Sequence, residues 1–552
     1  MLALIVGLYA AIFYPKILLG MGVVKPIEVV FGILAVILVM ESVRRVTNIV
    51  IPLIILLFII YAKFGYLMTG ILGTGNIIWP RLFQQLYLGA DFMLGVALRV
   101  ACGVVFGFIF FGTIFLKIGA GDFIVDLAYS TMGTIRGGPA KIAIIASSLF
   151  GMISGSAVAN VSAVGSMTIP LMKKTGYEDY YAGAVEATAG TGGQIMPPIM
   201  GAAAFVLAQF LGLPYRQVIV YAAFPAILFY LGLFLQVDLQ AMKKGLKGLP
   251  RENIPSLKKT LKEGWIFIIP VILLIICLFR LFLPADVSAI YAGAGAIILS
   301  LFRKNTRTLW NWNKILSILH STSRGIISVV VICAAAGFII GIASYTGLGL
   351  SFSQLLVQVA GKSLLFLGII TAITSTILGM GMPTTAAYVM LAVLAAPAMI
   401  ALGVLPIVAH LFVFYFGTLS MLTPPVCLSV YAAASISGGP PGKIALQSIK
   451  LAFAGYVVPF MFLFNPGILL IGDSILKIIL VMFFAILSIF LFAFSFEGYL
   501  FQKKLGILTR ILFFVGGMIL IIPNLLIRIF ICSVLGIISF YVYVVKIKGK
   551  KI

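Results

Sequence analysis

Long, uninterrupted apolar runs limit what this chain can fold into more than any other feature of its sequence. They include residues 49–61, 264–277, 478–496 and 525–545. A helix needs about 20 mostly apolar residues to cross the hydrocarbon of a bilayer, and only helices or closed barrels pair all of their backbone polar groups there. Because the runs do not alternate with a period of two, they predict spanning helices. The expected fold class is an all-α polytopic membrane protein.

Composition argues against a soluble protein and against a nucleic-acid partner. The chain is 62% hydrophobic and 9% charged, whereas soluble domains are roughly 45–50% apolar and about 25% charged. Its formal net charge of +24 comes from Lys and Arg residues between the apolar runs, where such residues set topology and contact membrane lipid. The five cysteines lie in apolar runs without a CxxC pair, which indicates packing roles and no transition-metal site.

The distribution of basic residues predicts a multi-pass protein of the inner membrane. The positive-inside rule places the most basic connection, residues 238–264, and the connection 303–314 in the cytoplasm. The connections with few charges, which we place outside, are residues 211–217, 284–286, 399–406 and 465–473. The basic tail at 546–551 then puts the C-terminus in the cytoplasm. The segment from Met1 to about Leu19 lacks a basic leader and is interpreted as a retained helix.

Two short patterns occur twice and predict an internal repeat. Gly119 lies in Lys-Ile-Gly-Ala-Gly and Gly347, 228 residues later, lies in Tyr-Thr-Gly-Leu-Gly. Pro197 ends Gln-Ile-Met-Pro and Pro424, 227 residues later, ends Met-Leu-Thr-Pro. The shared offset indicates that the two halves have the same order of elements. Five crossings are expected between them, and this odd number makes the second half inverted, as is common in transporters.

Each half contains two apolar segments that small residues interrupt. Residues 142–172 and 364–400 are too long for one crossing and begin and end beside connections assigned to one side, which predicts two re-entrant helical hairpins. Broken helices are expected at about 182–210 and 404–437, each with a Pro-Pro pair. Irregular backbone at membrane depth occurs only where it is buried or lines a watery cavity, so these four breaks are predicted to be functional.

The breaks have the chemistry to bind a cation and an anion. Carbonyls freed at a helix end, with nearby hydroxyl and amide oxygens, suit sodium, and the positive N-terminal ends suit an anionic substrate. We expect one cluster at 154–160 with 192–194, and a second at 379–385 with Thr423. The candidate substrate- and ion-binding residues are Ser154, Gly155, Ser156, Asn160, Gly192, Gly193, Gln194, Pro197, Pro198, Gly379, Met380, Gly381, Pro383, Thr384, Thr385, Thr423, Pro424 and Pro425.

Single residues of this set can also be explained by packing alone. Small residues in membrane helices usually serve close packing, but their recurrence with prolines in two halves favours binding. Glu186 is the one acid expected inside a span, where it would couple a proton or an ion, or would favour a helix N-terminus. His410 alone on an apolar segment is typical of packing. An enzyme, a passive channel and a primary pump are disfavoured, since clustered catalytic groups and a G-x-x-x-x-G-K-[ST] loop are missing from the sequence.

At these residues the sequence resembles a known family, the fused membrane permease of tripartite ATP-independent periplasmic (TRAP) transporters. The stretches that carry the resemblance are residues 153–160, 165–172, 182–187, 191–198, 378–388 and 422–426. Residues 237–241 and 410–416 resemble the fused small- and large-subunit type that works with a TAXI-class binding protein. The resemblance covers roughly Glu41 to Pro466 and implies an elevator mechanism, sodium coupling without another cofactor, and a periplasmic solute-binding protein as partner. It does not identify the solute, for which a small carboxylate is expected.

The resemblance also assigns the expected domains. Residues 1–90 are small-subunit-like scaffold helices, although only about three helices precede the large-subunit-like region. The remaining divisions are 91–240 for the first repeat, 241–320 for the basic loop and linking scaffold helices, 321–466 for the second repeat, and 467–552 for C-terminal membrane helices without an assigned role. We expect a monomer.

Overall fold

The structure confirms the all-α polytopic fold class. The computed structural model describes residues 1–19, 23–303, 306–307, 311–472, 474–500 and 503–548, and nine helices within these ranges are long and apolar enough to cross a membrane. The strands in these ranges are one short antiparallel pair, β1 (Tyr499–Leu500) and β2 (Lys503–Lys504). Parts of the predicted cytoplasmic connection 303–314 and tail 546–551 lie outside the described residues.

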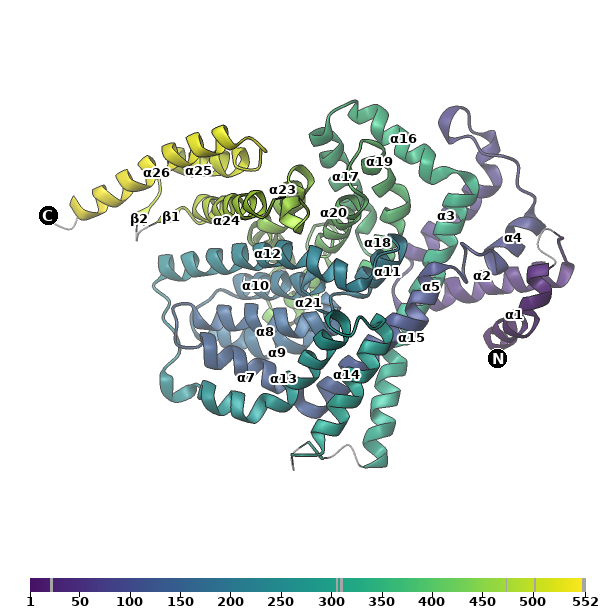
Figure 1. Cartoon of the computed structure of the whole chain (residues 1–552), viewed down its shortest axis with the longest axis horizontal. Coiled ribbons are helices and arrows are strands. Elements are labelled where there is room, and N and C mark those ends of the chain that lie inside the picture. The colour runs from purple at the N-terminus through teal and green to yellow at the C-terminus, as the bar shows by residue number, and fades with distance from the viewer. Residues whose placement is uncertain (20–22, 304–305, 308–310, 473, 501–502, 549–552) are drawn as a thin grey trace.

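The two ends of the chain lie at opposite ends of the molecule's long axis (Figure 1). At the N-terminal end, α2 packs against α4, α3 and the long helix α15. The N-terminal helices are α1 (Leu2–Leu19), α2 (Pro26–Val46), α3 (Val50–Phe64) and α4 (Trp79–Leu88). At the C-terminal end, α24 packs against α12 and α25. The C-terminal helices are α24 (Ile475–Glu497), α25 (Ile507–Ile519) and α26 (Leu525–Lys548).

The first half of the central region is a series of helices with two interruptions. Its helices are α5 (Val96–Val100), α6 (Phe106–Phe115), α7 (Gly121–Met132), α8 (Gly138–Ser154), α9 (Ala157–Lys174), α10 (Asp179–Gly192), α11 (Ala202–Phe210) and α12 (Tyr215–Lys244). The arms α8 and α9 pack against each other and against α10. Gly155 separates α8 from α9, and an irregular stretch that ends at Gly201 separates α10 from α11. This half therefore contains one helical hairpin and one broken helix.

The second half repeats this order after two linking helices, α13 (Leu257–Phe279) and α14 (Ala285–Ser300). Its helices are α15 (Trp312–Thr346), α16 (Leu348–Ala360), α17 (Leu364–Gly379), α18 (Thr384–Leu394), α19 (Ala396–Ala401), α20 (Pro406–Leu419), α21 (Leu428–Ser437), α22 (Pro441–Leu451) and α23 (Phe453–Phe464). The arms α17 and α18 pack against each other and against α20. The halves are in contact, because α10 and α9 pack on α21 and α11 packs on α18.

Glycines at equivalent positions of the two halves have similar structural tasks. Gly119 and Gly347 both have positive φ, 103° and 74°, and each stands between two helices. Gly151 on the hairpin of the first half approaches the broken helix so closely that a Cβ would lie 2.7 Å from the Cα of Gly193. In the second half, a Cβ on Gly379 would lie 2.8 Å from the Oγ of Ser420. Close packing of hairpin on broken helix is therefore a property of both halves.

Buried acids are more numerous than the sequence suggested. Glu186 is fully buried, but Glu28 in α2 and Glu497 at the end of α24 are only 2% exposed. Both helices are candidate membrane spans. The carboxylates of Glu28 and Glu497 are compensated by Lys25 at 3.3 Å and Lys450 at 2.6 Å. Two further acids are therefore buried beside lysines, Glu28 in the first turn of α2 and Glu497 as the last residue of α24.

Candidate functional site

The first hairpin is interrupted at a glycine that has no room for a side chain. Gly155 adopts the left-handed region with φ of 62°, and a Cβ there would lie 3.1 Å from the carbonyl oxygen of Met200. Ser156 follows in extended conformation, and its hydroxyl accepts a bond of 3.3 Å from the backbone N–H of Ala159. This serine caps α9, because it satisfies one of the N–H groups that a helix N-terminus leaves free.

Asn160 connects the first hairpin to the broken helix beside it. Its side chain is fully buried, and its Nδ2 donates to the carbonyl of Ser147 at 2.8 Å and to that of Gly190 at 3.4 Å. Its Oδ1 is buried without a hydrogen-bond partner, and so is the hydroxyl of Ser154. Buried polar atoms are almost always paired, so these two oxygens distinguish the first break from ordinary helix packing.

The second hairpin is interrupted in the same manner but by different residues. α17 ends at Gly379, Gly381 has a φ of 75°, and Pro383 immediately precedes α18. The carbonyl of Gly381 accepts a bond of 2.7 Å from the Nδ2 of Asn48, which lies between α2 and α3. The N-terminal helices therefore hold the tip of the second hairpin through a backbone contact.

The two halves meet at a hydrogen bond between one break and the other. The hydroxyl of Thr384, at the start of α18, donates to the Oε1 of Gln194 at 2.6 Å, and both side chains are buried. Both residues line a cavity of about 550 Å³. The candidate residues that line this cavity are Ser154, Gly155, Ser156, Gln194, Pro383, Thr384 and Thr385. The predicted separate clusters thus contribute to one shared cavity.

Four helix N-termini contribute to the lining of this shared cavity. They belong to α9, through Val158 and Ala159, to α11, through Ala202, to α18, through Thr384, and to α21, through Leu428. Each N-terminus carries a partial positive charge of about half an elementary charge and free N–H groups. The described lining contains no basic side chain, so these helix N-termini are its positively polarised elements.

The remaining candidates lie outside the cavity lining. Asn160, Gly192 and Gly193 are buried beneath it, and a Cβ on Gly192 would overlap the ring of Phe229. The hydroxyl of Thr423 is turned to packing contacts, since it donates to the Leu419 carbonyl and shares a bond of 2.8 Å with the Tyr456 hydroxyl. The others that do not line the cavity are Pro197, Pro198, Gly379, Met380, Gly381, Pro424 and Pro425, and the Pro197-Pro198 and Pro424-Pro425 bonds are cis.

Glu186 has its own polar surroundings on the buried side of the first hairpin. Its two carboxylate oxygens accept bonds from the hydroxyls of Ser147 at 2.5 Å and Thr168 at 2.6 Å. Ser147 and Thr168 were not singled out from the sequence, because a lone serine or threonine in a membrane helix carries no signal of a partner 39 or 18 residues away. His410 is bonded to the Tyr388 hydroxyl at 2.8 Å, which fits a satisfied packing residue.

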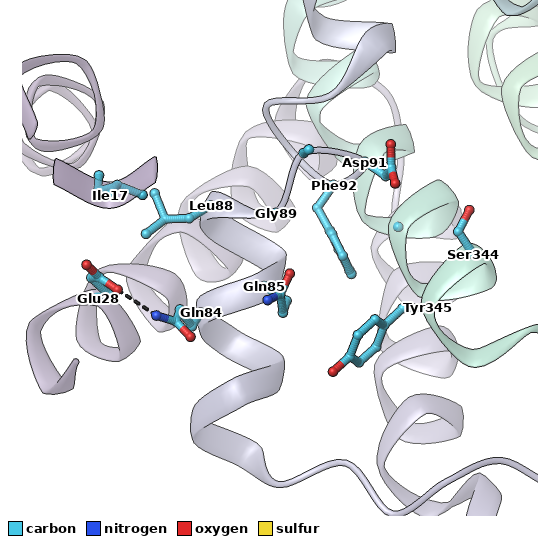
Figure 2. Close-up of a pocket in the computed structure, with 12 residues that line it drawn as sticks. Ile17, Glu28, Gln84, Gln85, Leu88, Gly89, Asp91, Phe92, Ser344 and Tyr345 are labelled. Atoms are coloured by element: carbon cyan, nitrogen blue, oxygen red, sulfur yellow. Dashed lines mark hydrogen bonds between the residues drawn. The ribbon is translucent and has the colours of Figure 1, made fainter. Parts of the chain in front are cut away.

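A second cavity, of about 420 Å³, lies between the N-terminal helices and α15. Figure 2 shows Glu28 bonded to Gln84 at one side of it, and Asp91 and Ser344 at the other. Its walls are formed by α1, α2, α4, residues 89–92 and α15. No helix break of either hairpin contributes to it, and its two acidic side chains do not favour an anion.

Close packing beneath the shared cavity can be tested by adding one methyl group. A Cβ on Gly193 would lie 2.6 Å from the Cα of Gly151, so two backbones would have to separate. We expect Gly193→Ala to lower the free energy of unfolding by about 1–3 kcal/mol, measured as a lower melting temperature in detergent. Gly103→Ala is the matched control, since nothing lies within 4 Å of a Cβ there. Equal melting temperatures for the two variants would contradict this packing.

A helical membrane chain in which two repeated halves bring helix breaks to one shared cavity belongs to the class of solute transporters. Comparison with known sequences then identifies the family. Residues 34–475 match the family described as "Tripartite ATP-independent periplasmic transporter, DctM component", and the chain belongs to this family of transporter permeases. The resemblance to TRAP transporter permeases noted in the sequence is thereby confirmed at the level of the family, while the fused type and the TAXI-class partner stay predictions. The family is one of transporter permeases and not of enzymes.

Characterised relatives resemble the chain over most of this region. The C4-dicarboxylate TRAP transporter large permease protein DctM of Pseudomonas aeruginosa is 25% identical over 341 residues, covering 62% of this chain and 77% of that protein. The sialic acid TRAP transporter large permease protein SiaM of Vibrio cholerae is 23% identical over 353 residues, covering 64% and 80%. The isethionate TRAP transporter permease protein DctMQ of Oleidesulfovibrio alaskensis is 25% identical, covering 60% and 52%.

Proposed function

We propose that this permease imports a small organic anion, expected to be a carboxylate, across the inner membrane by sodium-driven secondary transport. The observation that carries the proposal is the convergence of both helix breaks and four helix N-termini on one cavity. The printed names of the relatives support the anion, since they mention C4-dicarboxylate, sialic acid and isethionate. A periplasmic solute-binding protein, of the TAXI class, would deliver the solute, and the C-terminus would face the cytoplasm.

The oxygen atoms around the first break fit a sodium ion. Sodium is a hard cation that prefers oxygen ligands, and the Ser154 hydroxyl and the Asn160 Oδ1 are buried oxygens without a partner. Backbone carbonyls that α8 leaves free at its C-terminal end add further acceptors. These groups would hold the ion, and the ion would compensate the negative ends of the local dipoles. Asn160 would also keep the hairpin in register with α10 through its Nδ2 bonds.

We also propose that transport follows an elevator mechanism. The hairpins and broken helices pack on one another across the two halves, as α9 and α10 do on α21. The opposite cavity wall comes from α6 and α15, which pack together and against α14 and α2. The first group would move as the transport domain, while the second would stay as scaffold. The cavity lies between these two groups of helices, so a movement of one group relative to the other would expose it.

The driving ion can be tested with the purified permease in proteoliposomes together with its binding protein. We expect uptake of a radiolabelled carboxylate only with an inward sodium gradient and only when the binding protein is present. The variant Glu186→Gln distinguishes sodium coupling from proton coupling. Glu186 is buried with two hydroxyl partners and is the group that would carry the proton. Sodium coupling predicts that this variant keeps sodium-driven uptake. Uptake that persists without a sodium gradient and is lost in Glu186→Gln would replace sodium by the proton.

A further inference from the structure

We propose that the shared cavity is selective for a carboxylate with a single negative charge and a largely apolar body. The inference rests on the proposed function, because it takes the cavity to be the solute site. It narrows the solute beyond an organic anion, since it excludes dicarboxylates as preferred solutes. Three features of the cavity lining carry it: where its hydroxyls lie, which charges it contains, and what its opposite wall is made of.

Four of the seven described serine and threonine side chains that line the cavity lie at the helix breaks, namely Ser154, Ser156, Thr384 and Thr385. Thr385, in the first turn of α18, is 8% exposed and its hydroxyl makes no hydrogen bond within the described residues. The hydroxyl of Ser154 is likewise buried without a partner. Both residues line the cavity, Thr385 in the first turn of α18 and Ser154 at the end of α8, two residues before the N-terminal residue Ser156 that caps α9. A single carboxylate has two oxygens that accept such donors, and it would satisfy them together.

The described lining contains no charged side chain. Three basic residues adjoin lining residues in the chain, Arg45 before Val46, Lys117 after Leu116 and Arg324 before Gly325. All three are exposed and none lines the cavity; Arg45 pairs with Glu41 at 2.7 Å, and the ammonium group of Lys117 donates to the Ser317 hydroxyl at 3.2 Å. One anion can therefore be compensated by the helix N-termini, but no basic group is available for a second one.

The wall opposite the helix breaks is mainly apolar. It is formed by side chains of α6, of α15 and of the residue before α6, and its apolar members include Val105, Phe108, Ile109, Val329 and Ile332. The polar side chains on the scaffold side are Thr47, Thr113 and Ser328. Two of these are occupied within their own helices, since Thr47 donates to the Val43 carbonyl and Ser328 to the Gly325 carbonyl. This wall suits hydrocarbon.

The cost of burying a charge and the gain from burying hydrocarbon together decide whether the cavity prefers a monoanion or a dianion. A buried charge costs free energy unless a compensating charge or several hydrogen bonds accompany it. The first carboxylate finds helix N-termini and free hydroxyls, whereas a second carboxylate would face the apolar wall and lose its hydration. A hydrocarbon body placed there gains from being removed from water. We therefore expect a preference of about tenfold or more for the monoanion, which corresponds to about 1.4 kcal/mol.

Binding to the purified permease can be compared directly for three probes of similar size. We expect 4-methyl-2-oxopentanoate, a monoanion, to raise the melting temperature in sodium-containing detergent buffer. Succinate, a dianion, is expected to need at least about tenfold more ligand for the same shift. The neutral 4-methylpentanamide is expected to have little effect. Succinate that binds as well as the monoanion, an amide that binds equally, or no shift with any probe would each overturn the inference.

A charge-adding variant tests the assignment to this cavity. Ser328→Arg places a cation on the apolar wall, so we expect the preference to shift toward succinate, with its apparent affinity rising about tenfold. Ser323→Arg is the matched control, because Ser323 is exposed on the same helix and does not line the cavity. If Ser328→Arg does not fold, Thr113→Lys on α6 makes the same test. An unchanged preference in the folded variant would overturn the inference.

The inference and the proposed function fail in different ways. If the reconstituted permease with its binding protein takes up no carboxylate under a sodium gradient, the proposed function is wrong. If it takes up carboxylates but prefers succinate in uptake and in binding, only the selectivity for a monoanion is wrong. Sodium-driven uptake in which 4-methyl-2-oxopentanoate competes with the labelled solute more strongly than succinate does supports both.

Discussion

Asn160→Ala is expected to abolish solute uptake without removing the protein from the membrane. The substitution leaves two buried carbonyls, those of Ser147 and Gly190, without the amide that donates to them. It also removes the buried Oδ1 that has no protein partner. Contacts to a charged partner contribute about 1.5–3 kcal/mol, so loss of this ion ligand is expected to lower uptake by about 100-fold. The measurement is uptake in proteoliposomes at matched amounts of inserted protein.

A second readout separates ion binding from packing at Asn160. If its Oδ1 is a sodium ligand, sodium raises the melting temperature of the wild-type permease but not that of Asn160→Ala. Ser162→Ala is the matched control on the same helix, because Ser162 is exposed and its hydroxyl donates to the Val158 carbonyl within α9. We expect this control to keep uptake and the sodium effect. A sodium effect that survives in Asn160→Ala would assign the residue to packing alone.

The positions of the helix breaks could be predicted from the sequence because the residues that form them have distinctive backbone preferences. Gly155 and Gly381 are needed where φ is positive, and Pro383 precedes the first turn of a helix. The repeat of Gly119 at Gly347 and of Pro197 at Pro424, with nearly the same offset, added a second signal. Glycine and proline thus report local geometry directly, and the helices do end at these residues in the structure.

The side chains that bond to one another across the breaks could not be predicted from the sequence in this way. The bond between Thr384 and Gln194 joins residues 190 positions apart in different halves, whereas the sequence suggested two clusters, each within one half. Ser147 and Thr168 around Glu186 are ordinary residues of membrane helices. Apolar residues such as Ile332 are found equally on helix faces that contact lipid, so the sequence pattern does not show that they line a cavity. Such features depend on how helices pack, which local preference does not determine.

The bond between Thr384 and Gln194 is expected to be the strongest single link between the halves at the cavity. Thr384→Val keeps the shape of the side chain but leaves the buried Oε1 of Gln194 without its donor, and Gln194→Leu leaves the hydroxyl without its acceptor. Interhelical hydrogen bonds in membrane proteins contribute about 0.6 kcal/mol on average and up to about 1.7 kcal/mol. Because both side chains are buried, we expect a coupling energy near the upper value.

A double-mutant cycle on unfolding free energy in detergent measures this coupling. We expect each single variant to be destabilised by about 1–3 kcal/mol, and the double variant by clearly less than the sum, since it leaves neither partner unsatisfied. Uptake should fall by about tenfold or more in all three, because Thr384 also lines the cavity. Thr376→Val is the matched control on the other arm of the hairpin, where the hydroxyl donates within its own helix to the Ala372 carbonyl. Additive destabilisation with normal uptake would mean that the halves are held together elsewhere, and that the two breaks share a cavity without acting on each other.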